Sequence, residues 1–314
     1  MRTTEGIDPT TSPQEKAVPH ICVCICTYKR PEPLKRLLSE LNRQRTDNMF
    51  TYSIVVADND AAMSAEATVA EMSLTSPVPL KYCTQPRRGI ALTRNKVLEN
   101  AEGDYLALID DDEFPIPEWL LTLLKVCQDY KVEGVLGPVM RYFDEVPPVW
   151  LEKSDFYVRP VRPTGMRVDW NESRTSNVLL SSKVILGDPA PFREEFRAGE
   201  DQDFFRRKTE DGHAFIWSAE AIVYEVIPPA RWKRSYLLRR ALLQGACETL
   251  LPRCRAASIG KSIVAVPLYA VALPVMLLFG QRHFMTLLEK LFYHSGKLLM
   301  SIGINPIREE YISD

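Results

Sequence analysis

Short apolar runs alternate with helix-like stretches along the first part of the chain. The run ICVCICT at 21–27 is followed by PEPLKRLLSELNRQ, in which the leucines recur at helical spacing. The same order returns three times, at 52–58 and 62–74, at 80–84 and 91–101, and at 104–110 and 117–130. Strands that are buried on both faces and separated by helices are typical of a parallel sheet. The pattern predicts an α/β fold with a mainly parallel sheet flanked by helices.

The pattern becomes irregular in a long stretch at 139–175, which contains prolines and several aromatic residues. Irregular segments of this length inside a compact domain are usually lids or binding loops. Apolar strands are predicted again at 176–182 and within 214–226, and a helix is predicted to begin between them at about Glu200.

Composition divides the chain into three parts. Residues 1–19 are polar, contain no apolar signal-peptide core, and are predicted to form a disordered lead-in. The α/β domain is expected at 20–228, with one half at 20–138 and the other at 139–228. The remainder, 229–314, is expected to be helical.

The C-terminal part combines positive charge with a long apolar run. Between 228 and 261 there are eight Lys and Arg residues and one Glu, and residues 262–280 contain no charge at all. A helix of that length spans about 28 Å, close to the hydrocarbon core of a membrane. Although Pro267 and Pro274 interrupt it, we expect membrane association, spanning or in the membrane plane. A buried helix or a dimer contact is the alternative.

Charge and cysteine usage narrow the class of protein. The 314 residues carry a formal charge of −2, which gives no reason to expect a nucleic acid partner. Cys22, Cys24 and Cys26 alternate along one apolar run and should lie on one face of a strand. With only four histidines in the chain, we interpret them as reduced core thiols of a cytoplasmic protein and not as zinc ligands.

Polar residues follow three of the predicted strands, as CTYKR at 26–30, DND at 58–60 and DDDE at 110–113. Open α/β sheets bind ligands beyond the carboxyl ends of their strands. Carboxylate oxygens in this position suit Mg²⁺ or Mn²⁺, and such ions usually complete their shell with water and substrate phosphate. The alternative is a solvated acidic turn in front of the next helix.

Two further segments belong to the same predicted edge. Asp58 ends the second strand, although Asp-Asn-Asp is also a common turn sequence. The segment RRGIALTRN places Arg87, Arg88 and Arg94 around a glycine before a helix, which suits anion binding. A solvated basic loop would have the same composition.

Together, ICTYKRP, VVADND, GIALTRN, AEGDYLALIDDDEFP and the later GEDQDF resemble, in order and spacing, the family-2 inverting glycosyltransferases. The resemblance covers roughly residues 20–225 and is closest to bacterial enzymes of exopolysaccharide synthesis, such as succinoglycan glycosyltransferases. It implies the GT-A fold, with a Rossmann-like sheet, a nucleotide-sugar-binding half and an acceptor-binding half. The sequence departs from the family at Ala-Asp-Asn-Asp, where Asp-Asn-Gly-Ser or Asp-Asp-Gly-Ser is more usual.

The resemblance also implies roles for individual residues. Thr27 and Asp58 would hold the nucleotide base, with Arg88 nearby. Asp110 and Asp112 correspond to the Asp-x-Asp pair of the family, which binds Mn²⁺ or Mg²⁺. In that pair Asp112 would ligate the metal directly.

Two other acidic positions receive roles from the same resemblance. Asp111 would reach the ribose or the metal, and Asp201 would be the general base. A free carboxylate is needed to deprotonate the attacking hydroxyl, and Asp201 lies far from the metal cluster in sequence. Glu200 and Asp203 compete for this role, but on a helix they share a face that Asp201 does not. Acids stabilising a helix N-terminus are the alternative reading.

The acceptor side is predicted from aromatic and charged residues. Trp150, Tyr157 and Trp170 could stack on an acceptor sugar or could simply pack in the core. Glu200 is a further candidate for acceptor binding. Arg239 or Arg240 could reach the donor diphosphate.

The sequence thus predicts an inverting, metal-dependent glycosyltransferase that transfers a hexose from a nucleotide sugar, UDP-linked in our interpretation. The expected acceptor is a lipid-linked saccharide, met at the cytoplasmic face of the bacterial inner membrane. A sugar nucleotidyltransferase is the first alternative, although CTYKRPEP lacks the expected glycine. A non-catalytic nucleotide-sugar-binding scaffold at a membrane is the second.

Overall fold

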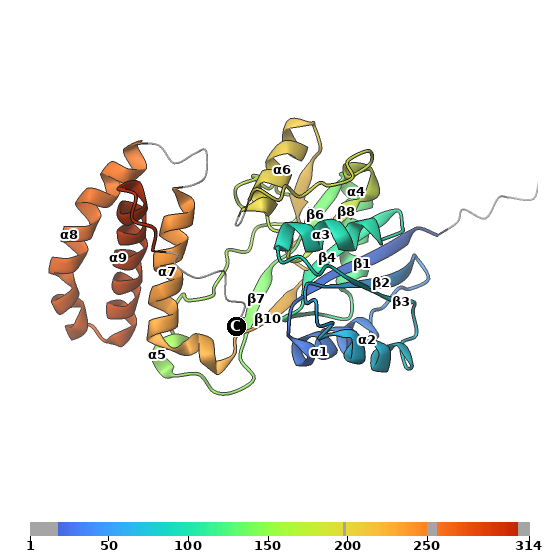
Figure 1. The fold of residues 1–314 in the computed structure, drawn as a ribbon, viewed down its shortest axis with the longest axis horizontal. Coiled ribbons are helices and arrows are strands. Elements are labelled where there is room, and N and C mark those ends of the chain that lie inside the picture. The colour runs from blue at the N-terminus through green and yellow to red at the C-terminus, as the bar shows by residue number, and fades with distance from the viewer. Residues whose placement is uncertain (1–17, 197–198, 250–255, 307–314) are drawn as a thin grey trace, which may run out of the picture.

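The computed structural model describes residues 18–196, 199–249 and 256–306. All but the last two positions of the predicted lead-in therefore lie outside the described residues. The expected catalytic part, residues 20–228, is built on one large sheet and one small sheet, and three long helices follow it (Figure 1).

The large sheet has seven strands, and the first four in its spatial order run parallel to one another. The next strand, β8, runs antiparallel to both of its neighbours, and the last pair is parallel again. The prediction of a mainly parallel sheet is confirmed. In spatial order the strands are β3 (Leu80–Thr84), β2 (Thr51–Asp58), β1 (His20–Thr27), β4 (Tyr105–Asp110), β8 (Val178–Ser181), β6 (Gly134–Leu136) and β9 (Phe215–Trp217).

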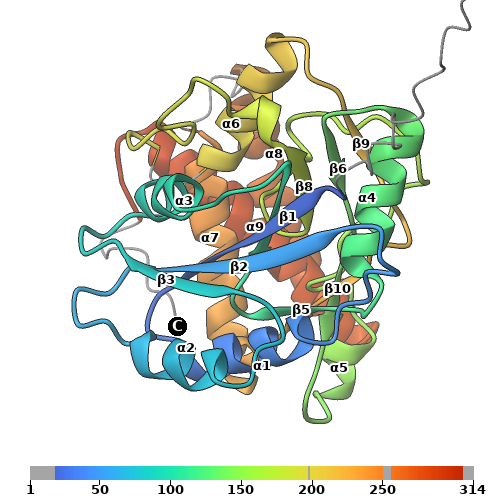
Figure 2. The ribbon, with the colours of Figure 1, turned by 90° about the vertical axis from the view of Figure 1, so that its right-hand side faces the viewer.

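Helices cover both faces of this sheet, as Figure 2 shows. Alternate residues of β1 point to opposite faces, so Ile21, Val23 and Ile25 join one core while Cys22 and Cys24 join the other. The three cysteines of β1 thus share a face, as predicted, and all three are free thiols. The first core is covered by α1 (Pro31–Leu41), α2 (Glu66–Ser73) and α4 (Trp119–Tyr130), and the second by α3 (Ile90–Glu99) and α6 (Glu200–Glu210).

A small three-stranded sheet begins where β4 ends. Its strands are β5 (Glu113–Pro115), β10 (Val223–Val226) and β7 (Val139–Tyr142), with β10 in the middle. Because β5 follows the acidic run directly, the pairing of β5 with β10 brings residues near 225 next to that run. The backbone N–H of Val226 donates to the carbonyl oxygen of Asp112 at 3.0 Å.

The C-terminal helices α7 (Arg234–Glu248), α8 (Ala256–Leu278) and α9 (Gln281–Ser301) lie beside the sheets, with α9 between the other two (Figure 1). The backbones of α7 and α9 meet closely at two glycines. A Cβ atom on Gly245 would lie 1.9 Å from the carbonyl oxygen of Tyr293, and one on Gly296 would lie 2.0 Å from that of Leu242. Only glycine fits at these two positions.

An apolar cluster attaches these helices to the catalytic part. Leu151, in the short helix α5 (Val149–Glu152), and Phe156 pack with Leu237 of α7 and Met285 of α9. The two remaining short elements are the 3₁₀ helices η1 (Ser182–Val184) and η2 (Pro229–Trp232). Because this packing crosses residue 228, the domain boundary expected there stays a prediction.

Candidate active site

The carboxyl ends of β2, β1 and β4 lie side by side and bring three predicted site residues together. In the sheet register Thr27 pairs with Asp58, and Cys26 pairs with Asp110. The parallel arrangement thus places the polar ends of these strands at one edge, because parallel strands end on the same side.

The hydroxyl of Thr27 and two arginines bind the acidic run. Thr27 donates from Oγ1 to Asp111 Oδ2 at 2.8 Å, and Arg30 donates to Asp111 Oδ1 at 3.1 Å. The same Arg30 nitrogen lies 3.2 Å from Asp112 Oδ2, to which Arg231 donates at 3.1 Å. Asp112, predicted to ligate a metal directly, therefore lies between two guanidinium groups.

The arginine network extends away from the acidic run into the second half of the catalytic part. Arg231 also contacts Glu225 Oε1 at 3.3 Å, and Arg159 donates to Glu225 Oε2 at 2.6 Å. None of these three residues was predicted from the sequence. No local pattern identifies them, since Arg231 is 119 positions from Asp112.

Two carboxylates of the acidic run are desolvated. Burial raises the pKa of Asp110 to about 6 and that of Asp111 to about 7. Among the described residues, none donates a side-chain hydrogen bond to the carboxylate of Asp110. Carboxylates that are desolvated without a full set of donors are stabilised by a cation, and their hard oxygens fit Mg²⁺ or Mn²⁺.

Within the described part of the chain, no three His, Cys, Asp or Glu side chains converge as a preformed metal cage. Such a cage is not needed for Mg²⁺ or a similar ion, which is commonly held by one or two carboxylates together with water and substrate phosphates. The residues present therefore fit a divalent ion that binds with its phosphate ligand.

The N-terminus of α6 reaches the same edge. Gly199 adopts a left-handed conformation with φ of 83°, and the helix begins at Glu200. Glu200 forms an ion pair with the buried Arg94 of α3. Burial alone would lower the pKa of Arg94, but nearby carboxylates hold it above its ordinary value. These carboxylates belong to Glu200, Asp110 and Asp201.

The three acids at the start of α6 are in different environments. Glu200 and Asp203 are buried and ion-paired, the latter with Arg206 at 3.0 Å and Arg207 at 2.9 Å. Asp201 is partly exposed and forms no ion pair with any residue that the structure describes. The expected separation of faces is present, and Asp201 is the acid of this group with a carboxylate not committed to a guanidinium.

The carboxylate of Asp58 accepts hydrogen bonds from neighbouring groups of the protein. Its side chain is fully buried and accepts hydrogen bonds from the backbone N–H groups of Asp60 and Ala65, at 2.9 and 2.8 Å, and from the Tyr82 hydroxyl at 3.0 Å. The turn interpretation of this residue thus has direct support. Its contact with a nucleotide stays a prediction.

Asn59, which the sequence did not single out, organises the basic loop. Its amide nitrogen donates to the carbonyl oxygens of Gln85 and Arg87 at 2.7 and 2.9 Å. Its amide oxygen accepts from the N–H of Gly89 at 3.0 Å. The Asx-turn tendency of Asp-Asn-Asp was the available signal, because such residues bind nearby backbone groups.

The three arginines of the basic loop separate. Arg94 is the buried partner of Glu200, and Arg87 pairs with Glu194. Arg88 is exposed and lies over the ring of Tyr28, with 4.6 Å between the guanidinium carbon and the ring centroid. Arg88 and Tyr28 together form an accessible aromatic and cationic pair near the end of β1.

The aromatic candidates for acceptor binding have packing contacts. Trp150 lies edge-on to Phe156, with ring centroids 6.1 Å apart, and Arg234 lies over its ring at 5.8 Å. Trp170 packs partly buried against the core that contains α3 and α6. Their roles in acceptor binding stay predictions, as does that of Glu200.

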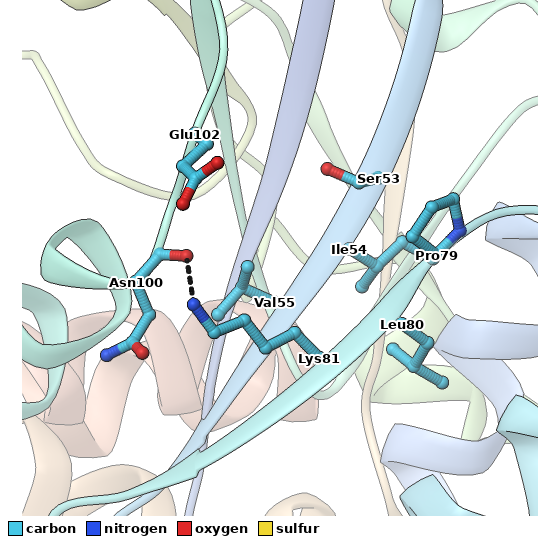
Figure 3. A pocket seen from close by; sticks show the side chains of 8 residues that line it. All are labelled: Ser53, Ile54, Val55, Pro79, Leu80, Lys81, Asn100 and Glu102. Carbon is cyan, nitrogen blue, oxygen red and sulfur yellow. Dashed lines mark hydrogen bonds between the residues drawn. The ribbon is translucent and has the colours of Figure 1, made fainter.

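A small cavity of about 210 Å³ lies near the amino ends of β2 and β3, on the side of the sheet away from the acidic run (Figure 3). Its walls come from the first halves of β2 and β3, including Ser53 and Lys81, and from Asn100 and Glu102. The ammonium of Lys81 donates to the carbonyl oxygen of Asn100 at 3.2 Å. Because the cavity faces the amino ends of the strands, it is separate from the acidic run.

Known proteins share this architecture. The mannosyltransferase PcManGT from Pyrobaculum calidifontis, solved with GDP-Man and Mn²⁺, has a TM-score of 0.61 at 17% identity, over 94% of this chain and 89% of that one. S. aureus TarS 1–349, solved with UDP, has a TM-score of 0.53 at 16% identity, over 90% and 92%. The fold is that of the GT-A glycosyltransferases.

Sequence comparison identifies the family. The family described as glycosyl transferase family 2 matches residues 22–186. The succinoglycan biosynthesis protein ExoM of Rhizobium meliloti (strain 1021) is 32% identical over 228 residues, covering 72% of this chain and 73% of that protein. The chain therefore belongs to glycosyl transferase family 2 and is a glycosyltransferase.

Proposed function

We propose that this protein is an inverting, metal-dependent hexosyltransferase of exopolysaccharide synthesis, which uses a UDP-sugar and a lipid-linked saccharide acceptor. Similarity to a succinoglycan biosynthesis protein supports the pathway class. TarS, which was solved with UDP, supports a uridine nucleotide.

One observation carries the proposal: Arg94 forms an ion pair with Glu200 at the start of α6, and it lies near enough to Asp110 and Asp201 for their carboxylates to raise its pKa. The acidic run and the start of α6 are thus neighbours in space although about ninety residues separate them in sequence. A transferase of this type needs one carboxylate set for a cation and a separate carboxylate for a proton. Asp110 with Asp112, and Asp201, are our assignments for these two tasks.

The reaction follows from these roles. The acceptor hydroxyl oxygen forms a bond to the anomeric carbon, and the bond from that carbon to the diphosphate oxygen breaks on the opposite face. Asp201 takes the hydroxyl proton. A divalent ion bound at Asp110 and Asp112 would neutralise the charge of the leaving diphosphate.

The donor site is proposed on the polar ends of the first strands. Thr27, Asp58, Arg88 and Asp111 are our candidates for holding the nucleoside. Tyr28, which stacks with Arg88, offers an aromatic face for the base.

Nucleotide release tests this proposal against its alternatives. We expect the purified full chain to release UDP slowly from a UDP-sugar when Mn²⁺ is present and not when EDTA is added, measured by chromatography over a panel of sugar nucleotides. Release of pyrophosphate from UTP and a sugar phosphate would instead identify a nucleotidyltransferase. Tight UDP binding without turnover, with saccharide acceptors also present, would identify a scaffold protein.

Membrane association of α8 is the second part of the proposal. Within the described residues, Ser258–Leu278 is the helical stretch long and apolar enough to cross a membrane, and only 11% of its most apolar window is buried. Val264, Leu268 and Val271 recur at helical spacing and are 66%, 60% and 77% exposed. This low burial argues against the buried-helix alternative. A lipid-linked acceptor would be met at the same surface, on the cytoplasmic side.

We expect the full chain to stay with membranes through a wash at high salt and to need detergent for release. Exposed charges are screened within about 3 Å at 1 M ionic strength, whereas apolar insertion is not weakened. The triple variant Val264→Asp, Leu268→Asp, Val271→Asp should move to the soluble fraction, since each buried charge costs about 2.5–3.5 kcal/mol in a membrane helix. Sedimentation and immunoblotting measure the distribution.

The matched control replaces three exposed apolar residues elsewhere, as Leu74→Asp, Val146→Asp and Leu186→Asp, which are 86%, 91% and 84% exposed. This control should stay with the membrane. Surface substitution is preferable to truncation at 228, because truncation also removes Arg231 from Asp112. A wild-type chain that is soluble without detergent would show that α8 packs against a second copy instead.

A further inference from the structure

A second cavity, of about 390 Å³, lies between the catalytic part and the C-terminal helices. Its walls come from the irregular segment at 155–159, from Glu225 of β10, and from residues of α7 and α9. The volume falls within the range of ligand pockets, roughly 300–1,000 Å³. The mechanism proposed above does not use this cavity.

The cavity adjoins the acidic run through a shared wall. Arg159 and Glu225 line it and are joined by a 2.6 Å hydrogen bond. On its other oxygen Glu225 accepts from Arg231, which in turn donates to Asp112. These ion pairs would therefore separate a ligand in the cavity from Asp112, which is assigned to the cation that neutralises the leaving diphosphate.

One wall of the cavity contains Tyr157, an aromatic residue with a strained backbone conformation. Tyr157 has φ of 62°, a left-handed conformation that is unusual for a bulky residue. Its hydroxyl donates to the carbonyl oxygen of Arg231 at 2.8 Å, and Arg240 lies over its ring at 5.0 Å. Strained residues of this kind concentrate at ligand sites.

The opposite wall presents polar side chains, of which those of Gln244 and Lys290 are exposed and that of Glu289 is half-buried. Within the described residues, the side chains of Gln244, Glu289 and Lys290 form no hydrogen bond or ion pair, although all three line the cavity. Burial raises the pKa of Glu289, and the positive charges of Arg240 and Lys290 act in the opposite direction. Such groups can exchange their hydrogen bonds with water for hydrogen bonds with the hydroxyls of a ligand.

The charges of the lining balance. It contains three cations, Arg159, Arg240 and Lys290, and three acids, Asp155, Glu225 and Glu289. A phosphate or diphosphate would face as many carboxylates as cations. An uncharged ligand with many hydroxyls and an apolar ring face suits this lining better.

We propose that this cavity binds the acceptor saccharide, holding the sugar residues next to the one that is extended. The inference rests on the proposed glycosyltransferase function and names the acceptor site within it. The position also suits a lipid-linked chain, because α9, which forms one wall, packs against α8 on its other side (Figure 1).

Saturation-transfer NMR on the full chain in a sugar-free detergent tests the inference. The probes are disaccharides of glucose, galactose and N-acetylglucosamine, with UDP and Mn²⁺ present. We expect saturation transfer to at least one disaccharide, and affinity for it at least tenfold weaker in the double variant Gln244→Ala, Glu289→Gln. Saturation should be strongest on one face of the sugar ring, because Tyr157 offers a flat surface.

The control variant is His283→Ala, an exposed position of α9 outside the cavity, and it should bind the same disaccharide as well as wild type. UDP affinity reports on folding of both variants. The inference is overturned if no disaccharide binds to a wild-type chain that releases UDP from a UDP-sugar, if the double variant binds as well as wild type, or if inorganic pyrophosphate displaces the disaccharide from the cavity. Absence of UDP binding and release would instead overturn the proposed function, and disaccharide binding would still report on the cavity.

Discussion

Replacing Asp201 by asparagine should reduce sugar transfer by about 10²-fold or more, the usual scale for loss of a general base. The affinity for UDP should stay unchanged, because Asp201 is assigned to the acceptor proton and not to the nucleotide. The substitution keeps the size of the side chain, and Asp201 forms no ion pair with a described residue, so the fold should tolerate it. Initial rates with a saccharide acceptor and calorimetric titration with UDP measure the two quantities.

Glu210→Gln is the matched control for this substitution. Glu210 is an exposed acid at the other end of α6, and within the described residues it pairs with Arg206 alone, so its loss changes helix charge without touching the site. Near-normal transfer in Asp201→Asn would move the base assignment to Glu200 or Asp203. Both of those are held by buried ion pairs and would have to release an arginine first.

Asp112→Asn should remove the gain in UDP affinity that Mn²⁺ provides. A direct ligand should matter at least as much as the outer-shell partners of metal sites, whose loss costs roughly 10- to 100-fold in metal affinity. Asparagine keeps the shape but removes the charge that also binds Arg30 and Arg231. Calorimetric titration of UDP, with Mn²⁺ and with EDTA, separates the metal-dependent affinity from the remainder.

Two variants complete this experiment. Asp129→Asn alters an exposed carboxylate of α4 outside the site and should leave the Mn²⁺ effect unchanged. Asp110→Asn should also weaken the effect, because Asp110 belongs to the same proposed pair. If Asp112→Asn retains the full Mn²⁺ effect while Asp110→Asn loses it, then Asp112 belongs to the arginine network and not to the metal site.

Both experiments address a site that joins the two halves of the catalytic part. Arg30 and Arg231, which lie about 200 positions apart in the sequence, both form ion pairs with Asp112, and Arg94 links α3 to α6. Binding of a cation and its diphosphate at Asp112 would compete with these guanidinium groups for the same carboxylate. We infer that the arginines can then turn toward the phosphates, which they suit as bidentate donors.

Features that depend on neighbouring residues could be predicted from the amino-acid sequence. Apolar runs and helical leucine spacing predicted the strands and helices, because side-chain periodicity follows local backbone geometry. The alternation in β1 placed its cysteines on one face for the same reason. The acidic run was correctly expected at the carboxyl ends of neighbouring parallel strands, since parallel strands with crossover helices must end together.

The tertiary structure decided which of these polar groups remain available. Local sequence could not show that Asp58 accepts hydrogen bonds from its own loop. It also could not show that Asp203 is ion-paired while Asp201 forms no ion pair with a described residue. Nor could it show that β8 is antiparallel, because an apolar run does not indicate the direction of its strand. Arg231 reaches Asp112, and the cavity forms beside Tyr157, only because segments far apart in sequence are packed together. Long-range ion pairs and cavities depend on packing that no local periodicity encodes.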